Sequence, residues 1–383
     1  MKLRAMLLAM ALVSGLAAFG FAIQNTGETG LTVHEWGTFT SIAGEDGMAL
    51  DWRPLAATND LPHFIHNVAA ANAGGLRHDC VKCDLTGKIR METPVLYFYT
   101  DRDTDVTVRV DFPKGTITEW YPNVRIVGSG IDWGRITVLP HANADLPVET
   151  GSNRYYAARE TDAAEVRVCN TNGRPAEFEK FLFYRGVGGF EPPVSVKLDG
   201  NRLQLAGLGG IAQVVVFENH GGNVGFRVLA VKANTTTIER PALGDSLPAL
   251  LTMMQQTLVS QGLYEKEAKA MIETWRDSWF EDGLRVFYIL PRYVTDSVLP
   301  ITISPQPTQL VRVLVGRIEI ITPERENAMR DELKRLDDPS PQVRAAARTA
   351  LRQSGRFAEP VLKRLLRGDN DTAHAGLAEE IWG

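Results

Sequence analysis

Alternation of apolar and polar residues predicts short β-strands over most of the first 240 residues. In segment 106–112, apolar side chains alternate with Thr107, Arg109 and Asp111, which is the period of two of a half-buried strand. Segment 212–217 is continuously apolar and predicts a central strand. Turns rich in Gly, Pro, Asn and Asp separate such strands, as is typical of antiparallel sandwiches. We therefore expect a mainly β protein with α additions (α+β), whose residues 30–240 form an antiparallel β-sandwich core, either one large or two small.

The apolar period becomes helical in region 241–322. Segments 247–261 and 263–282 predict two helices that are separated at Gly262, and the second carries one apolar stripe. Segment 284–290 returns to a strand pattern, and 310–321 is apolar on both faces, which predicts another central strand. This region is thus expected to be a helical insertion that returns to the sheet.

Residues 323–383 predict a separate, helical tail. Helices are expected over 342–351 and 360–366, the first of them after Pro341 and with the pattern Val-Arg-x-Ala-Ala. This pattern resembles a HEAT-type helical repeat, and only about one such repeat fits the tail. Because solenoid repeats bury their apolar faces against neighbours, the tail must pack on the preceding region or on a partner. It implies an interaction surface rather than chemistry.

The segment from residue 34 to residue 41 reads His-Glu-Trp-Gly-Thr-Phe-Thr-Ser. As a strand it would direct His34 and Glu35 to opposite faces, so we do not expect these two side chains to act as a dyad. A carboxylate on an apolar face is costly unless it is paired. We expect an arginine partner for Glu35, such as Arg90 or Arg159.

The start of the chain predicts export. Lys2 and Arg4 precede an apolar run that ends at Ala22, so residues 1–22 have the pattern of a cleaved signal peptide. An uncleaved membrane anchor is the alternative, because the run is about long enough to cross a bilayer. Together with segment 88–99, the octapeptide resembles a family of bacterial exported proteins that open with this motif, and the resemblance implies no particular activity. We expect a periplasmic or extracellular protein that is not integral to the membrane after cleavage.

The overall composition disfavours nucleic acid as a partner. The chain has 383 residues, of which 44% are hydrophobic and 23% are charged, with a formal net charge of -5. These fractions are those of an ordinary globular protein, and the charge gives no basic footprint for nucleic acid.

A zinc site is one candidate for chemistry. His63 and His66 would share a face of a helix expected over 63–70, and Cys80 and Cys83 form a C-x-x-C pair that supplies two thiolates. Two imidazoles and two thiolates complete a tetrahedral zinc site. In an exported protein, a Cys80–Cys83 disulfide or free thiols are the alternative, with Cys169 as a buried thiol.

An acidic ridge is a second candidate. Glu273, Asp277 and Glu281 follow one another at intervals of four residues on the second predicted helix. Like charges at this spacing destabilise an isolated helix. We expect local salt bridges from Lys269 and Arg276, or else a cation or basic residues from another element.

Scattered carboxylates are the third candidate. Glu35, Glu92, Glu160 and Glu218, the last with His220, could act as acid and base in a hydrolase. Arg–Glu pairs that join elements of the core are the alternative interpretation. The sequence lacks a Gly-x-Ser-x-Gly elbow, a His-Glu-x-x-His motif, a phosphate loop and a dinucleotide fingerprint.

These observations leave two hypotheses and do not decide whether the protein is an enzyme. The first is an exported cell-envelope binding or assembly protein that uses the tail and aromatic loops to hold a protein or an envelope polysaccharide. The aromatic residues expected in these loops are Trp52, Trp120, Tyr121 and Trp133. The second is an exported metal-dependent or carboxylate-based hydrolase acting on carbohydrate. Convergence of the carboxylates on one pocket would favour the hydrolase.

Overall fold

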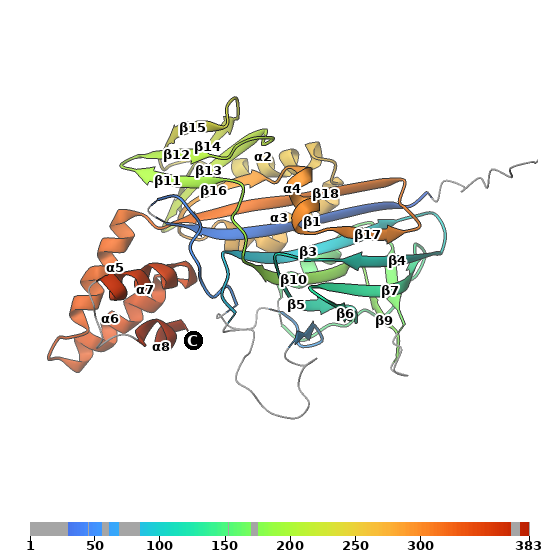
Figure 1. The fold of residues 1–383 in the computed structure, drawn as a ribbon, viewed down its shortest axis with the longest axis horizontal. Coiled ribbons are helices and arrows are strands. Elements are labelled where there is room, and N and C mark those ends of the chain that lie inside the picture. The colour runs from blue at the N-terminus through green and yellow to red at the C-terminus, as the bar shows by residue number, and fades with distance from the viewer. Residues whose placement is uncertain are drawn as a thin grey trace, which may run out of the picture.

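The computed structural model describes residues 30–44, 46–55, 61–68, 85–151, 153–169, 175–368 and 376–382. The predicted signal peptide and both residues of the C-x-x-C pair lie outside these ranges. The fold is mixed α/β and consists mostly of β-sheets, with several helices (Figure 1).

A nine-stranded sheet organises the molecule. Its strands, in spatial order, are β14 (Asn223–Ala230), β13 (Gln213–His220), β16 (Gly283–Ile289), β18 (Gln309–Ile320), β1 (Thr32–Ala43), β3 (Ile89–Tyr99), β10 (Leu182–Gly188), β5 (Gly115–Tyr121) and β2 (His66–Asn67). The central position predicted for segment 310–321 is confirmed, because β18 lies in the interior of the sheet. Strands from the predicted regions 30–240 and 241–322 therefore share one sheet.

The pairing of β1 with β18 differs from the predicted arrangement. These two strands run parallel, from Thr32 opposite Gln309 to Ala43 opposite Ile320, whereas the other neighbours in the sheet pair antiparallel. A purely antiparallel core was thus the wrong expectation. The period of two in a strand specifies which face a side chain occupies but says nothing about the direction of the neighbouring strand.

One face of the nine-stranded sheet packs against two smaller sheets. The six-stranded sheet contains β17 (Ile301–Ser304), β4 (Thr104–Val110), β7 (Gly130–Leu139), β8 (Glu165–Val168) and β9 (Glu177–Glu179), with β6 (Arg125–Val127) beside β7. The three-stranded sheet contains β11 (Ser195–Asp199), β12 (Arg202–Ala206) and β15 (Thr235–Glu239). Apolar side chains from all three sheets form one buried cluster, to which β1 contributes Val33 and Phe39.

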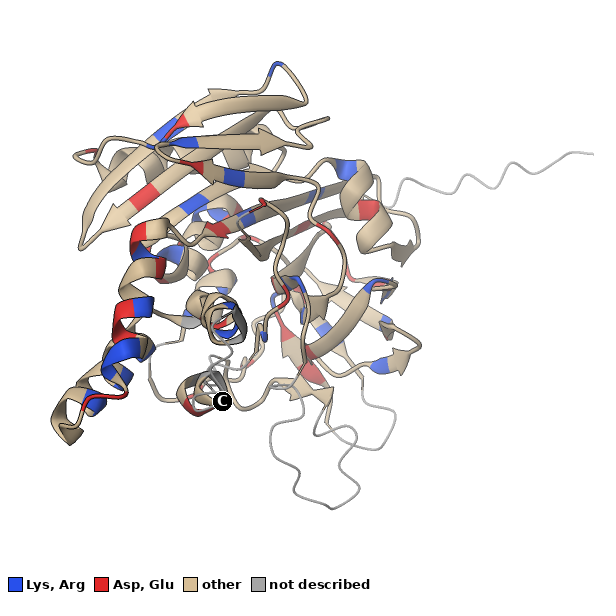
Figure 2. Cartoon of the chain, turned by 60° about the vertical axis from the view of Figure 1, so that its left-hand side comes forward, with Lys and Arg blue, Asp and Glu red and all other residues tan. Residues whose placement is uncertain are grey.

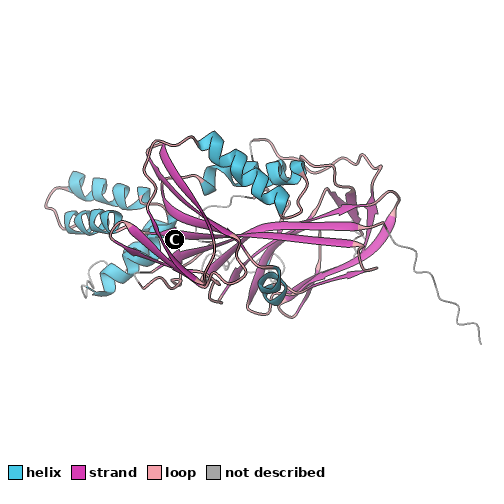
Figure 3. Cartoon of the chain, turned by 90° about the horizontal axis from the view of Figure 1, so that it is seen from above, coloured by secondary structure: helices cyan, strands magenta, loops and turns pink. Residues whose placement is uncertain are grey.

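Helices cover the other face of the nine-stranded sheet. The helices α2 (Leu247–Ser260) and α3 (Glu265–Trp279) confirm the two predicted helices, and the 3₁₀ helix η1 (Arg154–Arg159) lies beside α3. Their apolar side chains pack with Trp36 of β1 in a second buried cluster. Figure 3 shows α2 and α3 on one side of the long strands and the short helix α4 (Arg292–Val298) on the other.

The opening octapeptide lies in β1, which is buried along almost its whole length. Even and odd residues reach opposite faces as predicted, since Trp36 packs under the helices and Phe39 packs against the smaller sheets. Gly37 lies at an irregularity in the pairing with β3. A Cβ atom on this glycine would lie 3.0 Å from the backbone of Pro94, so the close approach of β1 and β3 here favours a residue without a side chain.

The tail is helical, as predicted, and packs on one end of the main sheet. It comprises α5 (Pro323–Arg335), α6 (Pro341–Gln353), η2 (Arg356–Ala358), α7 (Glu359–Gly368) and α8 (Leu377–Trp382). These helices have an apolar cluster of their own. Phe357 of η2 is outside that cluster and packs instead with Ile42 of β1 and with Trp52. Residues of both charge signs are interspersed along the outer helices of the tail (Figure 2).

Candidate functional site

Glu35 is held in a buried network on the face of the main sheet that packs against the smaller sheets. Its carboxylate accepts hydrogen bonds from Arg312 Nε at 2.5 Å and from Tyr184 Oη at 2.5 Å. The Arg312 guanidinium also donates to Asp296 of α4 at 2.8 Å. The prediction of an arginine partner is thus confirmed, but the partner is neither Arg90 nor Arg159.

Arg312 is the partner because the parallel register places it directly opposite Glu35. Burial disfavours the charged form of Arg312, but Glu35 beside it outweighs this effect and raises the pKa of the guanidinium above its ordinary value. The two residues therefore form a buried ion pair that is flanked by a phenol. This arrangement satisfies the carboxylate and leaves it no free approach for a substrate.

Glu92 and Glu160 lie in two further, separate places. Glu92 is buried on β3, where it faces Thr38 of β1, and its Oε1 lies 3.4 Å from Arg90 Nε. Glu35 and Glu92 are on opposite faces of the same sheet, because Thr38 is an even residue of β1 and Glu35 is an odd one. Glu160 follows η1 and is exposed.

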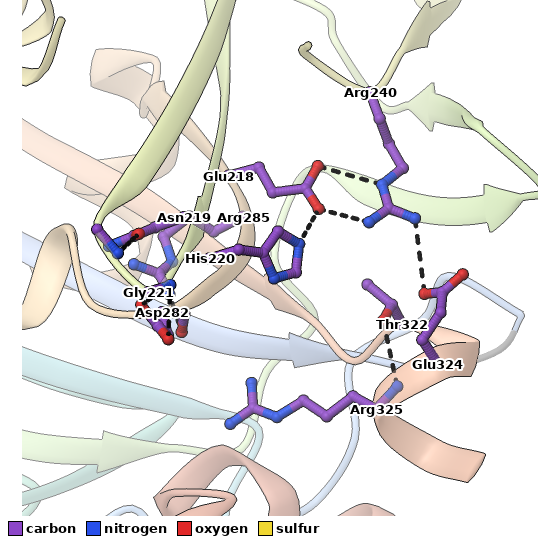
Figure 4. Close-up of polar contacts among 11 residues, drawn as sticks. Glu218, Asn219, His220, Gly221, Arg240, Asp282, Arg285, Thr322, Glu324 and Arg325 are labelled. Carbon is purple, nitrogen blue, oxygen red and sulfur yellow. Dashed lines mark hydrogen bonds and ion pairs between the residues drawn. The ribbon is translucent and has the colours of Figure 1, made fainter. Parts of the chain in front are cut away.

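Glu218 and His220 come together at the end of the main sheet that faces the tail (Figure 4). His220 Nε2 lies 2.7 Å from Glu218 Oε1. Arg240 donates to both oxygens of Glu218, through Nε at 3.1 Å and also through Nη2. Its Nη1 lies 3.6 Å from Glu324 at the start of α5. We name Glu218, His220, Arg240 and Glu324 the sheet-end cluster.

The sheet-end cluster combines one buried and one exposed titratable group. The Glu218 side chain is 4% exposed and that of His220 is 56% exposed. A buried carboxylate that orients an exposed imidazole is the arrangement that general bases use. In this cluster, however, Arg240 neutralises the same carboxylate and links it to the tail. The geometry therefore equally serves to hold β13 against the end of β15 (Thr235–Glu239) and the first turn of α5.

We expect the sheet-end cluster to make stability depend on pH. Burial opposes ionisation of Glu218, but hydrogen bonds from Arg240 and His220 outweigh it and lower the pKa of this carboxyl below its ordinary value. The unfolded chain therefore binds the proton more readily than the folded chain, and the contribution of Glu218 is lost as the pH falls through its folded pKa. Urea unfolding of the wild type and of Glu218→Gln from pH 7 to pH 3 checks this. The stability gap between the two proteins should narrow as the pH falls, and a gap independent of pH would contradict the prediction.

The proposed zinc ligands are only partly within the described residues. His63 lies in a turn and His66 lies in strand β2, so the predicted helix over 63–70 is wrong within the part that the structure describes. The ring of His63 lies 3.1 Å from Glu149, and the ring of His66 lies 2.9 Å from Glu177. Within the described ranges, no three His, Cys, Asp or Glu side chains are arranged to hold a metal ion. Because Cys80 and Cys83 lie outside them, the zinc site stays a prediction.

The predicted exposure of one cysteine and of four aromatic residues was wrong. Cys169 is exposed and not buried. The four aromatic residues expected in exposed loops are all core residues, each at most 4% exposed: Trp52, Trp120, Tyr121 and Trp133. The large aromatic side chains that are exposed in the described part of the chain are Tyr264 and Tyr293. Their position on the surface depends on helix packing and has no local sequence signal.

Two carboxylates of the acidic ridge are paired with arginines, each in a different way. Glu273 pairs with Arg276 on the same helix at 3.0 Å, as one of the predicted alternatives requires. Glu281, just beyond the helix, pairs with Arg317 of β18 at 2.9 Å, so another element supplies the basic residue. Arg317 is fully buried and also pairs with Glu319. One arginine of the sheet, Arg317, therefore offsets part of this ridge.

The sequence did not predict that His34 forms a buried pair with a glutamate. His34 Nδ1 lies 2.8 Å from Glu267 Oε2, and both side chains are fully buried. Tyr99 donates to the other oxygen of Glu267 at 2.8 Å. This pair joins the start of β1 to the first turn of α3. His34 and Glu35 thus bind different partners on opposite faces of the sheet, as the strand pattern predicted.

Comparison with known proteins does not assign the site. No protein-family model matches the chain, and no curated protein matches it. Among the described residues, no helix combines the length and the apolar character needed to cross a membrane.

Proposed function

We propose that the protein is an exported cell-envelope binding or assembly protein. One observation carries this proposal: the four candidate carboxylates occupy four separate neighbourhoods instead of one pocket. Glu35 and Glu92 lie on opposite faces of a sheet, Glu218 is bound by Arg240 at the sheet end, and Glu160 is exposed beyond η1. A pair of carboxylates that hydrolyses a glycosidic bond must flank one bond, within about 10 Å of each other.

The proposed localisation and partners follow from the sequence and fit this role. The amino-terminal pattern supports export to the periplasm or beyond, and the net charge of -5 disfavours nucleic acid as the partner. We also propose that the main sheet and the smaller sheets act as a sandwich-like scaffold and that the tail is a HEAT-like module for a protein contact. The partner is then an envelope polysaccharide, a protein or both.

A hydrolase is the second candidate, and the sheet-end cluster favours it. His220 is exposed and is held at 2.7 Å by buried Glu218, so its imidazole could accept a proton from water. This role needs a substrate beside His220 and a Glu218 that Arg240 does not fully neutralise.

A sedimentation assay separates the two candidates. The exported protein is incubated with an isolated bacterial envelope fraction, and both the pelleted protein and the released reducing sugar are measured. We expect the protein to pellet with the envelope, to release no sugar, and to behave identically in the variants Glu218→Gln and His220→Gln. Sugar release that His220→Gln abolishes would replace the binding role by the hydrolase. Failure to pellet would overturn the binding role outright.

A further inference from the structure

A groove crosses the end of the main sheet that is remote from the tail. Its walls are the last turn of α2 on one face and the first turn of α4 on the other. Its floor consists of the adjoining ends of β13, β16 and β18. The groove has a volume of about 550 Å³, which is within the range of pockets that hold small ligands. It is hereafter the α2–α4 groove.

The residues that line the α2–α4 groove include polar, aromatic and basic side chains as well as apolar ones, and none of them is an Asp or a Glu. From α2 and the turn after it come Ser260 and Gln261, both exposed. From α4 come Arg292 and Tyr293. The Tyr293 side chain is 67% exposed, although its hydroxyl donates to the Gly209 carbonyl at 3.4 Å. A fixed aromatic ring with its surface open to solvent is a suitable platform for stacking.

The buried guanidinium of Arg312 belongs to the same wall and has one nitrogen donor that is not hydrogen-bonded within the described residues. Arg312 lines the α2–α4 groove. Its Nε donates a hydrogen bond to Glu35, and its Nη1 donates one to Asp296. Its Nη2 is buried and has no hydrogen-bond partner in the described part of the chain. Arg292 is bound to the same Asp296 at 2.7 Å. Because an unsatisfied buried donor costs free energy, a ligand that brings an acceptor oxygen to this wall is favoured.

We propose that the α2–α4 groove binds an acidic polysaccharide, a chain of sugars that carry carboxylate groups. The inference rests on the proposed envelope-binding function and names its ligand class. The apolar face of a sugar ring would stack on Tyr293, its hydroxyls would bond to Gln261 and Ser260, and its carboxylate would lie near Arg292 and Arg312. Each guanidinium would offer this carboxylate a charge-assisted hydrogen bond, from Nη2 in Arg312, whose other nitrogens are already bonded.

A second basic groove competes for the same ligand and supplies the control. It lies between η1 and α3, with a volume of about 540 Å³, and Lys180, Lys266 and Lys269 are among its lining residues. Glu160 and Glu273 line it as well, so its charge is mixed. Lys266 is already paired with Asp162 at 2.5 Å. The exposed ring of Tyr293 and the unpaired Nη2 of Arg312 both favour the α2–α4 groove for an acidic sugar chain.

Affinity electrophoresis tests the inference with defined polymers. The exported protein is run in native gels that contain polygalacturonate, an acidic polymer, or dextran, a neutral one. We expect polygalacturonate to retard the protein and dextran not to. Tyr293→Ala should raise the dissociation constant for polygalacturonate about tenfold, the upper range for an aromatic contact. Gln261→Ala should weaken binding less, and Lys269→Ala, the matched variant in the other groove, should leave it unchanged. Added salt should weaken binding.

The outcomes separate the groove from the wider function. Equal retardation of Tyr293→Ala and wild type would overturn the groove, and the envelope-binding role would survive if the protein still pellets with the envelope. Loss of binding in Lys269→Ala alone would also overturn it, in favour of the groove beside η1. Equal retardation by dextran would overturn the acidic ligand class. If polygalacturonate is bound through Tyr293 but the envelope fraction is not, the groove stands and the proposed function fails.

Discussion

Replacement of Arg312 by methionine should destabilise the protein by about 3–5 kcal/mol, because it leaves the Glu35 carboxylate buried without its cation. Both side chains of the pair are fully buried, and among the described residues only the Tyr184 hydroxyl would still donate to Glu35. The expected result is a midpoint of urea unfolding well below that of the wild type with an unchanged slope. Equilibrium unfolding followed by circular dichroism measures it.

Two further variants make this prediction specific to burial. Arg292 pairs with Asp296, as Arg312 does, but both side chains of the Arg292–Asp296 pair are 45% exposed. Arg292→Met should therefore cost at most about 1 kcal/mol. The double change Glu35→Gln with Arg312→Met removes both charges and should recover part of the loss, since neutral replacements of buried pairs are often tolerated. Equal costs for Arg292→Met and Arg312→Met would contradict the buried-pair interpretation.

The Glu35 network shows how far the sequence determines this fold. The alternation in residues 34–41 was sufficient to place Glu35 and His34 on opposite faces, because the side-chain direction in a strand is a local property. The requirement for an arginine followed from the cost of burying a charge. The identity of that arginine did not, since Arg312 is 277 residues away and the parallel pairing of β1 with β18 that brings it near is a property of the whole sheet.

The candidate sites follow the same division between local and long-range information. The contact between Glu218 and His220 joins residues two positions apart on one strand, so the sequence already placed them together. The α2–α4 groove combines a helix end near Gln261 with Tyr293 and Arg312, which only the packed sheet brings together. The aromatic residues that were expected to be exposed, such as Trp52 and Trp133, were misjudged because residue type indicates burial poorly for tryptophan and tyrosine.

The last prediction concerns the contact between the tail and the body. Phe357 is 3% exposed and packs on Trp52 with ring centroids 5.6 Å apart. The guanidinium of Arg317 lies over its ring at 5.0 Å. Phe357→Ala should cost about 3–5 kcal/mol, as removal of a buried aromatic ring usually does. Because the tail has an apolar cluster of its own, the loss should appear as release of the tail from the sheet while both parts stay folded.

Limited proteolysis together with urea unfolding measures this release. In Phe357→Ala we expect faster cleavage near the junction between β18 and α5, and an early unfolding transition that the wild type lacks. Phe357→Leu is the matched variant, since it keeps an apolar side chain but removes the ring face that Arg317 covers, and it should lose only part of the contact.

A Phe357→Ala protein that resists cleavage and unfolds in one unshifted transition would show that the tail is held by other contacts. In that case the Arg53–Glu359 pair at 2.6 Å and the Arg240–Glu324 contact would have to carry the attachment. If the tail is released as expected, its helices form a separable module, and envelope binding by the α2–α4 groove at the opposite end of the sheet should persist without it.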